Sequence, residues 1–125
     1  EHALTQREKT WEKDPNYCCY LNKVAPLEEL KIHYSVWISG LMSWQSDHRK
    51  SLDIFEERNG ILKFYPLIDM SIAARSQRFE QEQLPQHPLV VKGYASIGCQ
   101  HCTVPGNDRN GRWNNSPKTE CGLHL

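Results

Sequence analysis

The sequence predicts an α/β fold, a layer of strands covered by helices, which we treat as a single partial domain over residues 1–125. Two apolar segments, residues 34–40 and 61–68, have the length and composition of buried strands. Each precedes a segment with helical periodicity, and this alternation of strands and helices is typical of an α/β layer. Because sheets of this kind usually have about four strands or more, we expect upstream strands outside this sequence.

The first elements are predicted to be helices. A short helix is expected around the adjacent cysteines at 18 and 19, and a second helix after Pro26. Leu27, Leu30 and Ile32 recur at helical spacing, which predicts that they form the inner face of that second helix.

Strand and helix signals then alternate along the middle of the chain. Residues 34–40 are typical of a buried strand that ends at Gly40. Residues 46–60 predict a helix, because they begin with capping residues and end with Asn-Gly. This prediction rests on Ser46 or Asp47 as the N-cap and on Leu52, Ile54 and Phe55 as apolar residues at helical spacing. Asn59-Gly60 is the predicted end of the helix.

After the strand at 61–68, residues 69–83 predict an amphipathic helix capped by Asp69 or Ser71. The chain beyond Leu84 is rich in Gly, Pro and Asn, so we expect irregular structure there. Residues 96–125 form its cysteine-containing end, and we expect whatever the cysteines bind to hold it in place.

Charge and hydropathy exclude two classes of partner. Fifteen basic and fifteen acidic side chains cancel, so the sequence lacks the basic excess of a nonspecific nucleic-acid binder. No apolar run approaches the roughly 18–20 residues of a membrane span. The N-terminal residues show neither an initiating Met nor a signal or transit pattern, so we expect the chain to begin at a processing boundary or to be a piece of a longer protein.

The five cysteines are an odd number, and four of them form two tight pairs, Cys18-Cys19 and Cys99-x-x-Cys102. Secreted disulfide frameworks usually have even counts and wider spacing. A reducing compartment therefore fits better, either the cytoplasm or an organelle stroma or matrix, with thiols that bind metal or perform redox chemistry.

A C-x-x-C pair holds zinc, ligates an iron–sulfur cluster, cycles as a dithiol, or consists of two unligated thiols. The adjacent pair favours ligation, because neighbours on a helix point about 100° apart and rarely both serve packing. Two plus two thiolates suit a tetrahedral zinc or a [4Fe–4S] cluster, and the ligand type does not separate these two.

The order of motifs along the chain resembles the C-terminal part of the sulfonucleotide reductases, a family that acts on adenylylsulfate (APS) or phosphoadenylylsulfate (PAPS). The match is closest to the APS branch, and the residues that choose between the two substrates lie largely outside this sequence. The motifs are CCYLNKVAPL, VWISG, QS with Arg49, LKFYPLI, LPQHPL, KGYASIGCQHCT, RNGRW and ECGLH. They extend from Cys18 to His124. The resemblance implies a Rossmann-like sheet of the adenine nucleotide alpha-hydrolase type.

The resemblance also implies a cofactor and a reaction. In the family the two cysteine pairs ligate a [4Fe–4S] cluster, which assigns these metal ligands to Cys18, Cys19, Cys99 and Cys102. The terminal-motif cysteine, here Cys121, attacks the sulfur of adenylylsulfate and forms a protein S-sulfonate and AMP. Thioredoxin or a glutaredoxin-like partner then releases sulfite, a step of sulfate assimilation toward cysteine.

Three cations are the candidate substrate ligands. Lys23 matches a family lysine that links cluster and substrate electrostatically, and Arg109 and Arg112 match the family's R-x-G-R. Guanidinium groups bind sulfate and phosphate oxygens in a bidentate manner; the alternative is three solvated surface charges. We also expect Gly98 to allow a close approach of backbone to the cluster, and His101 to donate to a cluster sulfur.

Departures from the family pattern leave two hypotheses. The sequence has no phosphate-binding S-G-G-type loop, and Met42 and Ser43 replace a basic pair. In the first hypothesis, the chain is part of an adenylylsulfate reductase and needs its missing N-terminal half for activity. In the second, it is a non-catalytic iron–sulfur or zinc-binding structural subunit of a larger assembly. We do not expect reductase activity from this chain alone.

Overall fold

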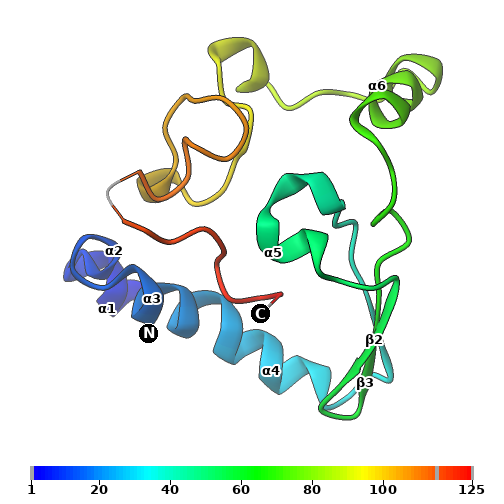
Figure 1. Ribbon diagram of the computed structural model, residues 1–125. Helices are drawn as coiled ribbons and strands as arrows, with labels where there is room; N and C mark the ends of the chain where they lie inside the picture. Colours follow the sequence, from blue (N-terminus) through cyan, green and yellow to red (C-terminus); the bar gives the residue numbers. More distant parts are fainter. Residues whose placement is uncertain (1, 115, 125) are drawn as a thin grey trace. The chain divides into compact units, whose positions relative to one another are not determined.

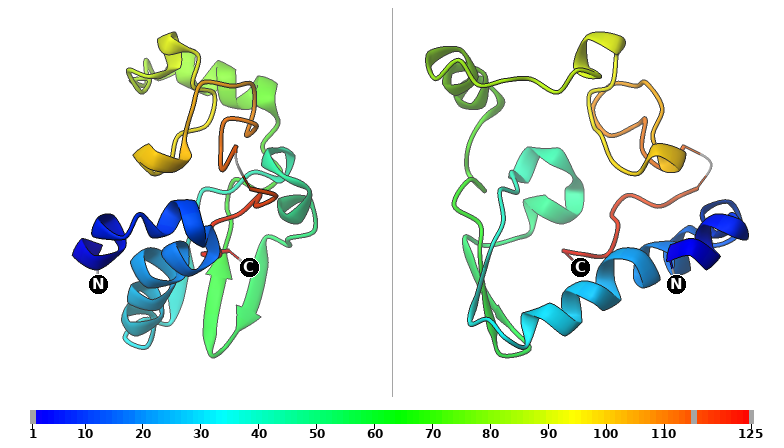
Figure 2. Two further views of the ribbon diagram at one scale, coloured as in Figure 1. Left: turned by 90° about the vertical axis from the view of Figure 1, so that its left-hand side faces the viewer. Right: turned by 180° about the vertical axis from the view of Figure 1, so that it is seen from behind.

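The computed structural model describes residues 2–114 and 116–124, with side chains from residue 4 onward. The chain forms two compact units (Figures 1 and 2). One unit, here called the cysteine unit, joins the segment up to His33 with the segment from Gly93, and it contains all five cysteines. The other, the sheet unit, comprises Tyr34–Lys92.

The sheet unit is built on three strands, β1 (Val36–Ile38), β2 (Phe55–Arg58) and β3 (Ile61–Phe64). Their order is β1-β3-β2, with β1 parallel and β2 antiparallel to the central β3. Figure 2 shows β2 and β3 as an antiparallel pair. The predicted α/β class and both predicted strands are thus confirmed, and β2 is an additional strand.

The helix predicted over residues 46–60 is wrong beyond its first turn. Ser46 caps α5, whose bounds are Asp47–Lys50, by accepting a hydrogen bond from the Arg49 N–H at 3.3 Å. The chain then enters β2 and turns at Asn59-Gly60, where both residues have positive φ. Asn-Gly with two positive φ values is the preferred two-residue hairpin turn, and the helix prediction took it for a helix stop.

The core of the sheet unit is small, and it lies on one side of the sheet. Leu41, Tyr65 and Ile68 are buried together, with Leu52 packed against them. The opposite face of the sheet is apolar but open, since Val36, Ile38 and Phe55 are 45%, 64% and 53% exposed. The prediction that β1 is buried is therefore wrong for the residues of this chain.

The helix predicted after β3 is present as α6 (Ile72–Gln81). Ser71, one of the two predicted caps, accepts a hydrogen bond from the Ala74 N–H at 3.1 Å. Beyond Leu84 the described residues form two short 3-10 turns, η3 (Val90–Lys92) and η4 (Gln100–Cys102), and two isolated β-bridges, so the predicted irregular structure is confirmed.

The cysteine unit begins with a series of helical segments (Figure 1). These are α1 (His2–Arg7), α2 (Thr10–Lys13), α3 (Pro15–Cys19), the π-helical η1 (Tyr20–Val24) and α4 (Ala25–Lys31). The predicted inner face of the last helix is wrong beyond Leu27, because Leu30 and Ile32 are exposed. Periodicity shows which side chains share a face but not whether the chain supplies anything to cover it.

No helix among the described residues is both long enough and apolar enough to cross a membrane.

Candidate metal and thiol site

Helix α3 presents the adjacent cysteines. Asp14 caps this helix by accepting a hydrogen bond from the Tyr17 N–H at 2.9 Å, and Pro15 occupies the first helical position. Cys19 is buried and Cys18 is half-buried. The wider π-helical turn of η1 follows at once, a form that often marks functional sites.

The C-x-x-C pair lies on a tight turn from the other end of the chain. The Cys102 N–H donates to the Cys99 carbonyl at 3.0 Å, and the Thr103 hydroxyl donates to the same carbonyl at 2.8 Å. The Trp113 N–H donates to the Cys102 carbonyl at 2.9 Å, which fixes this turn to the loop that contains the arginines.

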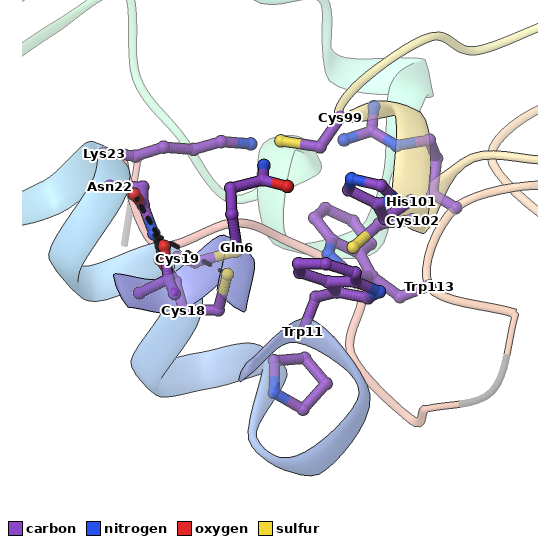
Figure 3. A pocket seen from close by; sticks show the side chains of 13 residues that line it. Gln6, Trp11, Cys18, Cys19, Asn22, Lys23, Cys99, His101, Cys102 and Trp113 are labelled. Atoms are coloured by element: carbon purple, nitrogen blue, oxygen red, sulfur yellow. Dashed lines mark hydrogen bonds between the residues drawn. The ribbon is translucent and has the colours of Figure 1, made fainter. Parts of the chain in front are cut away.

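One pocket brings all four of these cysteines together, as Figure 3 shows. It encloses about 70 Å³, several times the roughly 10–15 Å³ that one water needs. The predicted ligand residues Cys18, Cys19, Cys99 and Cys102 line it, and so do the predicted cations Lys23 and Arg112. Among the described residues, no three Cys, His, Asp or Glu side chains are close enough to bind one metal ion as they stand.

The thiols and Lys23 influence one another electrostatically. Burial and, to a smaller extent, the neighbouring Cys99 raise the pKa of the Cys18 thiol, and burial is also the main cause of the raised pKa values of Cys19 and Cys102. Burial alone would lower the pKa of Lys23, but its hydrogen bond to Cys99 and the negative potential of nearby thiolates raise it overall. Lys23 therefore stays a cation that favours thiolates in this pocket.

Arg112 lies directly on Gly98, so this glycine has a neighbour that the sequence did not predict. A Cβ at position 98 would overlap the Arg112 guanidinium. Nη1 of Arg112 donates to the Ile97 carbonyl at 3.0 Å, and its guanidinium lies 4.5 Å from the Trp113 ring centre. Nε of Arg112 is buried without a hydrogen-bond partner among the described residues.

Arg109 makes different contacts from its motif partner. Its Nη2 donates to the Thr119 carbonyl at 2.8 Å and to Glu120 Oε2 at 3.1 Å. The substrate-binding role predicted for Arg109 stays a prediction, and in this structure the side chain binds the C-terminal segment.

Cys121, the predicted nucleophile, follows Glu120 and is half-buried. It interacts electrostatically with Cys19 and with Lys23, so the C-terminal segment returns to the helix of the cysteine pair. Gly122 has a φ of +96°, and a Cβ at this position would lie 3.1 Å from Val24 Cγ2. The chain thus turns sharply beside η1 directly after Cys121.

Aromatic residues that we did not assign to the site complete the pocket. Trp11 stacks on His101 with ring centres 3.9 Å apart, so His101 has an aromatic neighbour inside the C-x-x-C. Trp113 is buried and has three cations within 5.9 Å of its ring centre, namely Arg109, Arg112 and Lys118. Trp113 could have been predicted as a site residue because it lies in the R-x-G-R-W motif. No sequence motif indicated Trp11.

Asn22 is a second unassigned residue of the site. Its Nδ2 donates to the Cys18 carbonyl at 2.8 Å and to Cys18 Sγ at 3.7 Å, and it also contacts Thr5 Oγ1 at 3.1 Å. Nitrogen donors near a ligand thiolate stabilise its charge. The four-residue spacing of Cys18 and Asn22 on a helix was the only available signal.

Comparisons with known proteins identify the family of this chain. The family model of the phosphoadenosine phosphosulfate reductase domain matches residues 1–105. Two similar proteins are named adenosine 5'-phosphosulfate reductase: one from Bacillus mycoides, 42% identical over 131 residues, and one from Halalkalibacterium halodurans, 43% identical over 130 residues. These alignments cover 100% and 99% of this chain and 56% of each relative.

A crystal structure of phosphoadenylyl-sulfate (PAPS) reductase from Candida auris, a phosphate complex, shares the fold with a TM-score of 0.66. That match has 24% sequence identity and covers 83% of this chain and 52% of the other. The chain belongs to the phosphoadenosine phosphosulfate reductase family. It spans about half the length of the curated relatives it matches.

Proposed function

We propose that this chain is the C-terminal part of an adenylylsulfate reductase and that its four pocket cysteines hold a [4Fe–4S] cluster. The observation that supports this most is the convergence of two cysteine pairs, about 80 residues apart in the sequence, on one pocket that Lys23 and Arg112 also line. The names of the bacterial relatives support the same reaction.

The residues of the pocket fit such a cluster chemically. Four thiolates are the usual ligand set of a [4Fe–4S] cluster, and the same set also fits a structural zinc ion. Thiolates bring negative charge. Lys23, which is charged, and Arg112 Nε, which has no hydrogen-bond partner within the described part of the chain, are suited to balance it. When bound, the cluster would cross-link α3 to the C-x-x-C turn and add a fixed charge beside these cations.

The proposed chemistry takes place at Cys121. Its thiolate attacks the sulfur of adenylylsulfate; an S–S bond forms, and the bond from sulfur to the phosphate oxygen breaks, so AMP leaves with the electron pair. A dithiol partner of the thioredoxin or glutaredoxin class then attacks Cys121 Sγ and releases sulfite. Its second thiol breaks the mixed disulfide, which oxidises the partner and restores Cys121.

The substrate site needs more than this chain contains. The relatives are nearly twice as long as the match, so we infer that their N-terminal half supplies the nucleotide-binding part. The exposed apolar face of the sheet and the outer edge of β1 suit that half, because an open strand edge favours further pairing. The free thiols suggest a reducing compartment, the cytoplasm or an organelle stroma or matrix.

One observation favours a second candidate, a non-catalytic iron–sulfur or zinc-binding structural subunit of a larger assembly. Arg109, a candidate substrate ligand, is bound to Glu120 of its own chain. In that case the metal would stabilise the fold, and the open sheet face would contact another subunit.

The first test is a measurement of iron, zinc and acid-labile sulfide in protein purified without oxygen. About four irons and four sulfides per chain support the cluster; one zinc without sulfide contradicts it. The second test adds the N-terminal half of a relative and follows AMP and sulfite formation from adenylylsulfate. Activity that Cys121→Ser abolishes supports the reductase, whereas an inactive mixture of correctly loaded chains supports the structural subunit.

A further inference from the structure

The C-terminal tail, residues 116–124, is anchored to the rest of the cysteine unit through an ion pair of low exposure. Nη2 of Arg109 lies 3.1 Å from Glu120 Oε2, and the two side chains are only 20% and 3% exposed. The same Nη2 donates to the Thr119 carbonyl at 2.8 Å, so one guanidinium nitrogen binds two consecutive tail residues.

A second contact secures the tail on the side of the cysteine pair. Nζ of Lys118 donates to Asn16 Oδ1 at 2.5 Å, and Asn16 lies in α3 with Cys18 and Cys19. Residues 118, 119 and 120 are thus all bound immediately before Cys121. Directly after Cys121, a Cβ at Gly122 would lie 3.1 Å from Val24 Cγ2, so the tail lies against η1 at the residue that follows Lys23.

The two contacts differ in what they contribute. Lys118 reaches a neutral amide that is exposed to solvent, so this bond is weak. Glu120 is a buried carboxylate in a charge-assisted pair, and breaking such a pair costs more than losing an exposed contact to a neutral amide. Arg109 and Glu120 therefore contribute more to the bound position of the tail than Lys118 does.

We propose that Glu120 is a positioning residue: its carboxylate, held by Arg109, fixes Cys121 beside η1, where the next residue, Gly122, lies against Val24. This inference rests on the proposed role of Cys121 as nucleophile. It assigns Arg109 the role of binding the C-terminal tail. Loss of the pair frees the tail and moves the thiol away from the pocket, while the four pocket cysteines keep their places.

The experiment measures how fast a maleimide labels Cys121 in the full-length chain, with labelled peptides identified by mass spectrometry. We expect Glu120→Gln and Arg109→Gln each to raise the labelling rate of Cys121 at least about tenfold, because each breaks a buried pair. Metal content and labelling of Cys99 should stay at the wild-type level. The matched control is Glu12→Gln, which breaks the exposed pair with Lys9 at 3.8 Å and should change nothing.

Rescue separates positioning from general loss of structure. The charge exchange Arg109→Glu with Glu120→Arg restores an ion pair and should return the Cys121 labelling rate most of the way to that of the wild type. Wild-type labelling in Glu120→Gln, or an exchange variant as reactive as the single variants, overturns the proposal. Neither result depends on turnover, so a chain whose tail is positioned but which stays inactive after the N-terminal half of a relative is added would contradict the proposed function alone.

Discussion

The two units of this chain are stabilised by different interactions. Among the described residues, five buried apolar side chains belong to the sheet unit, Leu41, Met42, Ile61, Tyr65 and Ile68, and only Cys19 and Trp113 to the cysteine unit. The sheet unit also has a strand ladder. The cysteine unit relies on tight turns, an aromatic stack and ion pairs, so its two distant segments need a further link.

The two units are therefore sensitive to different kinds of change. Burial of apolar surface is nondirectional and tolerates modest change, whereas a unit built from a few specific polar and thiol contacts depends on single residues. We therefore expect bound metal to determine whether the cysteine unit folds and to have little effect on the sheet unit.

Loss of the metal should produce the largest difference in stability between the two units. Cys99→Ser removes one of four proposed thiolate ligands, and metal binding to such sites contributes on the order of 10 kcal/mol to folding. We expect bound iron to disappear and amide hydrogens of the cysteine unit to exchange rapidly, while those of β3 stay protected. The control Cys121→Ser should retain its iron. Equal loss of protection in both units would show that they fold as one.

A cavity in the core of the sheet unit should destabilise that unit and leave the cysteine unit unchanged. Ile68 is buried beside Tyr65, so Ile68→Ala is expected to destabilise the sheet unit by about 2–5 kcal/mol in chemical unfolding. Iron content should not change. The matched control Val91→Ala, at a position that is 89% exposed, should cost little. Iron loss in Ile68→Ala would contradict the independence of the units.

Two glycine-to-alanine substitutions should each lower the stability of one unit, the first through a steric overlap and the second through backbone strain. In the cysteine unit, Gly98→Ala overlaps the Arg112 guanidinium and should cost about 1–3 kcal/mol. In the sheet unit, Gly60→Ala meets no atom within 4 Å, but its φ of +75° should cost about 1–2 kcal/mol. Adding Arg112→Ala should recover stability only in Gly98→Ala. If the recovery is absent in urea unfolding, the steric explanation is wrong.

The smallest expected effect is a loss of stability of the sheet unit at alkaline pH. Burial and the nearby Glu56 carboxylate raise the pKa of Tyr65 from 10.0 to about 12, so folding favours the neutral phenol. This contribution to stability is complete below pH 10 and is lost as the pH rises through about 12. Tyr65→Phe keeps the ring and should flatten this loss in unfolding curves measured between pH 10 and pH 12. An unchanged slope would contradict the assignment.

Several features could be predicted from the sequence because their causes are local. Ser71 caps α6 through a backbone N–H three residues away, and Asp14 and Pro15 start α3 in the same way. The motif order predicted the family, which the family model confirms. The two cysteine pairs predicted a common site, and they do line one pocket. Their role as cluster ligands stays a prediction.

Other features depended on partners that are distant in the sequence. Leu52, Ile54 and Phe55 predicted a helix over residues 46–60, yet residues 55–58 form β2, because β3 offers a ladder of hydrogen bonds and Phe64 stacks on Phe55 at 4.7 Å. Leu30 and Ile38 match buried patterns but are exposed, since no other part of the described chain covers them. Pattern alone does not specify what an apolar face meets.

By itself, the sequence determined the types of chemical group available to this protein: four paired thiols, a terminal thiol, and cations within short motifs. Only the tertiary structure decided how these groups are paired. It placed Arg112 over Gly98 and gave Arg109 to Glu120, although both arginines belong to one four-residue motif. The physical reason is that an ion pair forms with whichever charge the folded backbone brings within about 3–4 Å, and sequence spacing in a loop does not fix that distance.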